Sequence, residues 1–241
     1  AAESDSFERI IQNGTAIVDI GGSSIQISVF DKGRLITTQN IRMGKVSTRQ
    51  KFYPMAKNNE HYVKLVMELL EHELNGFGRL YQKDRQINNL IVLDNDLLKL
   101  LTDDQNADKP VPSVQKNRFH TVYDDIVFLN PDSIREKYNM LADSAAFVVN
   151  SAIICKALLE KFGAEVLWLP SMGLATGMCY DFAVEQKLIR PEHIFDEDII
   201  ASARSIAKRY KSNQSHIKYM EELTLQIFDK LKKVHGMGQK E

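Results

Sequence analysis

The sequence predicts an α/β fold, in which helices pack on the faces of a mixed β-sheet. Three observations indicate this fold. Strand-like segments follow one another in the first part of the chain, helical stripes then alternate with short apolar strands, and only helical patterns remain after Pro191. The 241 residues are 44% hydrophobic and 26% charged, a composition typical of a globular protein that folds without metal or disulfide support.

Three strands are predicted in the first part of the chain. Thr15–Ile20 is an apolar strand, and Ser24–Phe30 alternates polar and apolar residues with the period of a half-buried strand. Asp31–Gly33 is a hairpin turn, after which Arg34–Met43 is predicted to be the third strand. The three strands therefore form an antiparallel meander.

Helices and strands alternate in the middle of the chain. Helices are predicted at Glu60–Gly76, Leu141–Phe162 and about Leu174–Lys187. The short segments Asn89–Leu93 and Glu165–Leu169 are rich in apolar residues and are predicted to be strands that are buried on both faces. The polar segment Thr102–Asp125 is interrupted by prolines, so a long surface connection is expected there.

The order of these elements matches one half of an actin-like, or ribonuclease-H-like, fold. The meander runs on into alternating helices and parallel strands, which gives a mixed sheet. After Pro191, two amphipathic helices at Asp196–Tyr210 and Ser215–Val234 add no further strand. We therefore expect residues 1–190 to form the actin-like domain and residues 191–241 to begin a helical domain.

Charge and composition exclude several kinds of partner and location. Thirty-one basic and thirty-two acidic residues leave a net charge of −1, so neither nucleic acid nor an anionic membrane is an expected partner. No segment approaches the roughly 18 uninterrupted apolar residues of a membrane span. Ala1–Arg9 lacks the features of a signal peptide, so we expect a cytoplasmic protein, in which Cys155 and Cys179 are free buried thiols.

The turn between the first two strands is the first candidate site. Glycines at Gly21 and Gly22 let the backbone approach a phosphate, and successive N–H groups can bind an anion, with the hydroxyls of Ser23 and Ser24 as further donors. Asp19, at the end of the strand, could bind magnesium. The alternative is an ordinary turn, because glycine and serine are common in turns.

A second candidate lies where a buried strand leads into a helix. Gly173 and Gly177 flank the start of that helix, and the N–H groups of a helix N-terminus attract anions. The alternative is a close contact between helix and strand that requires small residues.

Other motifs are missing or weak. There is no P-loop and no G-x-G-x-x-G, and the six histidines show no metal-ligand spacing. A run of acidic residues is expected to be a solvated loop; it comprises Asp94, Asp96, Asp103, Asp104 and Asp108.

Several segments resemble one known family. Val18–Gln26 (VDIGGSSIQ) resembles the DIGGGSTE segment of the exopolyphosphatase and guanosine pentaphosphate phosphohydrolase family, Ppx/GppA. Ile41–Val46 is similar to that family's S-L-P-x-G-x-V strand, and Leu169–Asp181 to its G-L-R-E-G-x-L-Y-D turn and helix. Arg209–Leu231 resembles the start of the family's C-terminal helical domain. The resemblance thus spans most of the chain in the same order.

The resemblance implies a second actin-like domain that takes part in magnesium-dependent hydrolysis of a terminal phosphoanhydride, on polyphosphate or guanosine pentaphosphate (pppGpp). It assigns Asp19 to the metal, and it places Gln26 where the family has a glutamate. Phosphate binding is assigned to Gly21, Gly22, Ser23, Ser24, Gly173 and Gly177. The family's first domain, with the glutamate assigned as catalytic base, would precede Ala1, and the family's habit suggests a homodimer.

The chain departs from the family pattern at several of these positions. Ser23, Ile25 and Gln26 replace a glycine, a threonine and the glutamate, and Ala175-Thr176 replaces an Arg-Glu pair. Asp94–Asp96 stands where the family has a G-G-T turn, and these carboxylates are expected to repel phosphate. Two functions therefore stay open: a hydrolase in which this chain alone is inactive, or a protein that binds a phosphate ligand or a protein partner without hydrolysis. A kinase of the same superfold is a third and more distant alternative.

Overall fold

The structure is a computed structural model, and it describes residues 10–102, 111–190 and 195–237. The chain divides into two compact units, with the boundary between Ala201 and Ser202. Each unit is described by itself.

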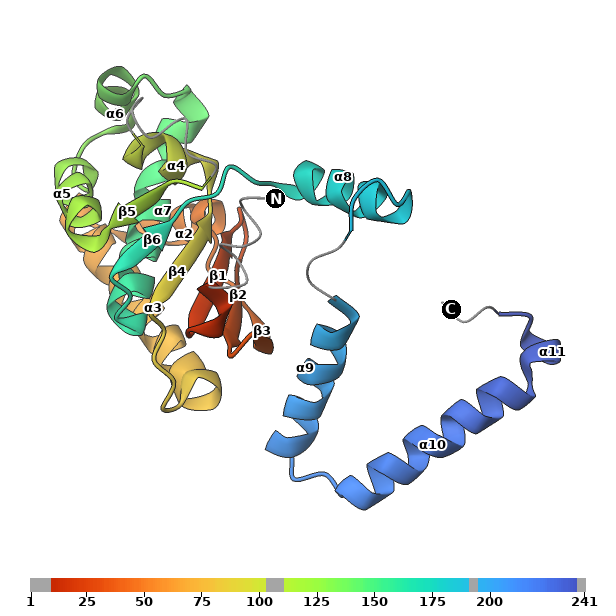
Figure 1. The fold of residues 1–241 in the computed structure, drawn as a ribbon. Helices are drawn as coiled ribbons and strands as arrows, with labels where there is room; N and C mark the ends of the chain where they lie inside the picture. The colour runs from red at the N-terminus through yellow and green to blue at the C-terminus, as the bar shows by residue number, and fades with distance from the viewer. Residues whose placement is uncertain (1–9, 103–110, 191–194, 238–241) are drawn as a thin grey trace. The chain divides into compact units, whose positions relative to one another are not determined.

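The first unit is built on a six-stranded mixed sheet with the strand order β3-β2-β1-β4-β6-β5 (Figure 1). The strands are β1 (Thr15–Ile20), β2 (Ile25–Asp31), β3 (Arg34–Ile41), β4 (Asn89–Leu93), β5 (Ser113–Gln115) and β6 (Val166–Trp168). β1, β2 and β3 pair antiparallel, β4 lies parallel to β1, and β6 lies parallel to β4. The carboxyl ends of β1, β4 and β6 consequently lie at one edge of the sheet. The predicted mixed α/β sheet is confirmed.

The meander forms as its sequence pattern requires. Ile25, Ile27 and Val29 are buried on one face of β2, while Gln26 on the other face is exposed. The turn into β3 has positive φ angles at Lys32 (54°) and Gly33 (71°), the backbone of a tight hairpin turn.

Eight α-helices are described in this unit or at its end, and most of them surround one central helix. They are α2 (Lys45–Phe52), α3 (Asn59–Phe77), α4 (Asn95–Leu101), α5 (Lys116–Ile126), α6 (Pro131–Tyr138), α7 (Ala142–Phe162), α8 (Leu174–Glu185) and α9 (Phe195–Arg209). Short turns at η1 (Tyr53–Met55) and η2 (Gly78–Gln82) flank α3. α7 packs against α2, α3, α4, α5 and α6.

The apolar character of α7 follows from this central position. Within the described residues, α7 is the one helix long and apolar enough to cross a membrane, and 67% of its most apolar window is buried inside the fold. A mostly buried core helix passes the same test of length and composition. The burial accounts for the composition of α7 without a membrane.

Three expectations from the sequence need correction. The segment Thr102–Asp125 is no plain surface connection, because β5 and most of α5 lie in it, and α5 buries Phe119, Val122 and Tyr123. The end of the predicted third strand is a separate element: β3 stops at Ile41, and α2 begins at Lys45. Cys155 is buried as expected, but Cys179 is exposed.

Three helices occupy the described end of the chain, and only the last two lie wholly in the second unit. α9 crosses the boundary between the units and is followed by α10 (Gln214–Lys230) and α11 (Lys232–His235). α10 begins after Asn213, whose side-chain oxygen accepts a hydrogen bond from the His216 N–H at 3.1 Å. The predicted helices Asp196–Tyr210 and Ser215–Val234 thus agree with α9 and with α10 and α11 together.

Candidate phosphate-binding site

The first candidate site is the loop Gly21–Ser24, which follows the carboxyl end of β1. The loop is closed by a hydrogen bond from the Gly21 N–H to the Ser24 carbonyl at 3.0 Å. Gly22 and Ser23 are exposed, and in the described part of the chain their backbone N–H groups donate to no acceptor. Two adjacent free donors in a tight loop can bind a phosphate oxygen.

The start of α2 holds this loop in place. The N–H groups of Val46 and Ser47 both donate to the Gly22 carbonyl at 2.9 Å, and the Lys45 N–H donates to the Gly21 carbonyl at 3.0 Å. These bonds satisfy the first donors of the helix, which are orphans in an isolated helix. The N-terminus of α2 therefore fixes the loop and does not itself offer free donors to an anion.

Gly44 is required for this contact. A Cβ atom at Gly44 would lie 2.3 Å from the Ser24 nitrogen and 2.5 Å from the Gly22 carbonyl carbon and oxygen. Backbone atoms cannot yield as a flexible side chain can. Gly44 thus allows the close approach of helix and loop.

Asp19 and Gln26 lie opposite each other next to the loop. They are register partners on β1 and β2, and both side chains are exposed. Directly opposite residues on one face of a sheet have Cβ atoms about 5 Å apart. The two side chains therefore lie on the same face of the sheet, which for Gln26 is the polar face expected from the pattern of β2.

This pair fits magnesium only in a limited way. No group of three or more His, Cys, Asp or Glu side chains among the described residues could hold a metal ion. Mg²⁺ usually keeps several waters and binds one or two protein carboxylates together with substrate phosphates. Asp19 and Gln26 match that mode, in which the metal arrives with its phosphate ligand.

The turn after β4 is held by hydrogen bonds of the buried Asp94 side chain. The expected solvated acidic loop is therefore wrong for Asp94. Asp94 is 6% exposed. Its Oδ1 caps α4 by accepting from the N–H groups of Asp96 and Leu97 at 2.9 Å each. Its Oδ2 accepts from Ser151 Oγ at 2.8 Å and from Lys45 Nζ at 3.0 Å.

Lys45 neutralises much of the acidic charge at this turn. Its Nζ also lies 2.7 Å from Asp96 Oδ2, so one ammonium contacts two carboxylates. Burial lowers the pKa of Lys45, but hydrogen bonds to Asp96 and Asp94 and their negative charges outweigh the burial and raise it overall. The expected repulsion of phosphate by Asp94 and Asp96 is therefore reduced by an internal cation. Asp103, Asp104 and Asp108 lie outside the described residues.

Lys45 is fixed from its backbone as well. The Asn150 Nδ2 donates to the Lys45 carbonyl at 2.6 Å, and Tyr62 Oη donates to Asn150 Oδ1 at 2.9 Å. Burial raises the pKa of Tyr62 to about 12. A chain of hydrogen bonds thus joins α3 and α7 to the start of α2 and its loop.

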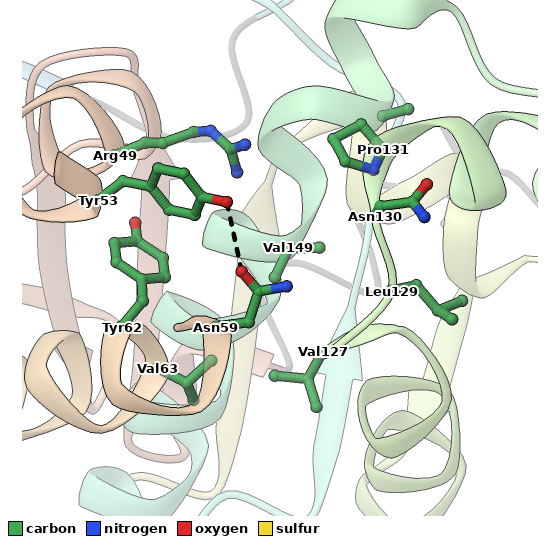
Figure 2. A pocket seen from close by; sticks show the side chains of 11 residues that line it. Arg49, Tyr53, Asn59, Tyr62, Val63, Val127, Leu129, Asn130, Pro131 and Val149 are labelled. Carbon is green, nitrogen blue, oxygen red and sulfur yellow. Dashed lines mark hydrogen bonds between the residues drawn. The ribbon is translucent and has the colours of Figure 1, made fainter. Parts of the chain in front are cut away.

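A small cavity lies beside Tyr62. Figure 2 shows Arg49, Tyr53 and Tyr62 on one side and Leu129, Asn130 and Pro131 on the other. The Arg49 guanidinium lies 4.6 Å from the centre of the Tyr53 ring, and the Tyr53 hydroxyl donates to Asn59 Oδ1 at 3.3 Å. The cavity has about 50 Å³ of space, which is large enough for water but too small for a phosphate ligand.

The second candidate site, around Gly173 and Gly177, is open. Gly173 precedes α8, and Gly177 lies within it. A Cβ atom at either glycine would meet nothing within 4 Å, so the alternative of a close helix–strand contact finds no support among the described residues. The segment follows β6 and therefore starts at the same sheet edge as the Gly21–Ser24 loop, but no hydrogen bond or ion pair between described residues joins the two.

Comparison of the whole chain with solved structures identifies the fold. A Ppx/GppA family member from Aquifex aeolicus matches with a TM-score of 0.60 at 16% identity, covering 76% of this chain and 63% of that one. An exopolyphosphatase from Cytophaga hutchinsonii matches with a TM-score of 0.52 at 15% identity, covering 75% and 62%. The chain has the fold of the Ppx/GppA phosphatases.

The resemblance seen in the sequence is thus confirmed at the level of the fold. This Ppx/GppA fold is found at 11% to 17% identity, and the chain spans 57% to 63% of the length of the matched structures. No protein-family model matches the chain. No curated protein has a sequence close enough to match either.

The sequence did not point to the groups that hold the loop. Lys45 lies far from Asn150 and Ser151 in the chain, and only the structure joins Asn150 to the Lys45 carbonyl and both Lys45 and Ser151 to Asp94. One signal was present: Asn150-Ser151 interrupts an apolar helix, and buried polar side chains need partners.

Proposed function

We propose that the chain is part of a phosphoanhydride hydrolase of the Ppx/GppA type, which releases the terminal phosphate of polyphosphate or pppGpp. The observation that carries the proposal is the Gly21–Ser24 loop. It presents two N–H groups that have no acceptor among the described residues, at the carboxyl end of β1, within a fold shared with an exopolyphosphatase structure. Ligands of open α/β sheets bind at the carboxyl ends of the strands.

In this proposal the loop binds and orients the terminal phosphate. The N–H groups of Gly22 and Ser23 donate to its oxygens, and the Ser23 and Ser24 hydroxyls add donors. Asp19 and Gln26 hold Mg²⁺, which when bound neutralises phosphate charge. The first N–H groups of α8, which follow Gly173, contribute further donors from the same sheet edge, whereas the Gly177 N–H already donates to the Gly173 carbonyl at 3.1 Å.

Gln26 limits what this chain can do by itself. An amide can orient a water molecule by a hydrogen bond, but it cannot take a proton at neutral pH as a carboxylate does. The base that removes the proton from water is therefore assigned to the remainder of the complete enzyme. A homodimer and a cytoplasmic location remain predictions from the sequence.

A second function, phosphate binding without hydrolysis, is favoured by the same residue. Gln26 stands where the family has glutamate, and Lys45 closes the turn after β4 by contacts within the chain. Both features are compatible with binding and unfavourable for catalysis.

One experiment separates the two functions. Phosphate release from polyphosphate and from pppGpp is measured with Mg²⁺, using the longest natural chain, for the wild type, Gln26→Glu and the exposed control Gln50→Glu. Release by the wild type supports the hydrolase. If the wild type is inactive while polyphosphate raises its melting temperature, the binding function stands. If the wild type releases no phosphate and polyphosphate does not shift its melting temperature, both functions are refuted.

A further inference from the structure

A second cavity lies beside the phosphate loop, between α2 and α3. It is open to solvent and has about 210 Å³ of space, and two exposed cationic residues line it, Arg42 and Lys51. Ser47 and Thr48 of α2 also line it, and Glu73 is the one carboxylate among its lining residues. We propose that this cavity is a second anion site, which binds a phosphate group.

The charges of the cavity favour an anion. Within the described residues, neither Arg42 nor Lys51 lies within ion-pair distance of a carboxylate, and Lys51 Nζ instead lies 5.0 Å from the centre of the Phe52 ring. Two cations against Glu73 leave a net positive charge. Arginine and lysine side chains bind phosphate in proteins, and they are available to do so when no carboxylate of the chain pairs with them.

Arg42 and Lys51, and not the hydroxyl groups, supply the donors of the cavity, because Ser47 Oγ already donates to the Ser23 carbonyl at 3.1 Å. Ser47 and Lys51 are four residues apart, so their side chains lie on one face of the helix. The Thr48 hydroxyl oxygen has no accessible surface and therefore does not face the space of the cavity.

The cavity is next to the phosphate loop. Ser47 Oγ, at the wall of the cavity, donates to the Ser23 carbonyl at 3.1 Å. A phosphate in the cavity can therefore come from two sources: free inorganic phosphate, or a distal phosphate of a chain whose end is bound at Gly22 and Ser23. The second source rests on the proposed function, while the anion site itself does not.

Equilibrium titration by calorimetry tests the site without any need for hydrolysis. Inorganic phosphate and tripolyphosphate are titrated into the wild type, Arg42→Gln/Lys51→Gln and Glu73→Gln. The control is Lys57→Gln/Lys64→Gln, which removes two exposed cations outside the cavity. Melting temperatures verify that each variant is folded.

We expect the cavity double variant to bind about tenfold more weakly or worse, because it loses two charge-assisted contacts. Glu73→Gln should bind more tightly, an effect that misfolding cannot imitate. The control should stay within about twofold of the wild type. Weaker binding of both probes identifies free phosphate as the ligand, and weaker binding of tripolyphosphate alone identifies a distal phosphate.

Two results would overturn the site: wild-type affinity of the cavity variant for both probes, or an equal loss in the control. The outcome is separable from that of the proposed function. Failure of hydrolysis with weakened binding in the cavity variant removes the function and keeps the site. If the wild type hydrolyses its substrate but the cavity variant binds both probes as the wild type does, the proposed function stands and the second anion site is refuted.

Discussion

Lys45 joins three parts of the fold through three different atoms. Its N–H contacts the phosphate loop, its carbonyl accepts from Asn150, and its ammonium contacts Asp94 and Asp96. A side chain that is 20% exposed and paired with a buried carboxylate contributes more than a surface ion pair.

Replacement of Lys45 by methionine should therefore destabilise the first unit by about 2 kcal/mol at neutral pH, because Asp94 is left buried without its cation. The raised pKa of Lys45 means that its contribution is fully present below its ordinary pKa of 10.5 and is lost as pH rises through the higher folded value. Urea denaturation should thus show that the difference in free energy of unfolding between the wild type and Lys45→Met becomes smaller above pH 10.5. Lys45→Arg should retain most of the stability; equal losses in both variants would contradict the ion pair.

Thr48 is a residue whose hydroxyl group should destabilise the first unit. Its buried hydroxyl has no partner in the described structure, and a buried unsatisfied polar group costs about 1–3 kcal/mol. We expect Thr48→Val to raise the free energy of unfolding by about 1 kcal/mol. Thr37 is the matched control, since it is also buried but its hydroxyl accepts from Gln39 Nε2 at 3.0 Å, so Thr37→Val should not stabilise.

At the scale of elements, the loop and α2 behave as one piece. Gly44 allows their contact, and a Cβ atom there would meet backbone atoms at 2.3 Å.

Gly44→Ala should destabilise the first unit by about 2–3 kcal/mol, since overpacking forces backbone shifts. Gly177→Ala is the control, because that glycine lies in an exposed helix with open space around it. Alanine there should be neutral or stabilising. Thermal unfolding of the two variants checks both statements, and a wild-type melting temperature for Gly44→Ala would refute the contact.

The strands and helices of the first unit follow from the sequence to different extents. Strands β1, β2 and β4 and helix α7 were predicted almost to the residue, because alternating or wholly apolar patterns determine them. α2 was missed since Thr48 is its only buried residue, so its helix depends on contacts with the loop and α7. α5 was missed because nearby prolines and polar residues concealed the helical spacing of Phe119, Val122 and Ile126.

The candidate site was predictable only in part. Glycine and serine between two strands indicated the loop itself, whereas the contact of Lys45 with Asp94 joins residues 49 positions apart. Such a pairing follows from the sheet order and the docking of α7, neither of which a local pattern encodes.

At the scale of the whole molecule, alkaline pH should weaken the fold. Burial raises the pKa of Tyr62, Tyr123 and Tyr138 to about 12 each, from an ordinary value of 10. The unfolded chain releases these protons first, so stability should fall between pH 10 and about 12. Urea denaturation across this range, followed with tyrosinate absorbance, measures the effect. Substitution of Tyr62 by phenylalanine should reduce the pH dependence, and an unchanged slope would exclude its contribution.

The parallel pairing of β4 with β6 also sets an order of events during folding. β1, β2 and β3 pair with neighbours in the sequence, whereas α4, β5, α5, α6 and α7 must be passed before β6 can join β4. Contacts between distant segments form slowly, because the entropy of loop closure opposes them. We therefore expect the glycine loop to form early with its hairpin, and Asp94 to gain Ser151 of α7 only late in folding.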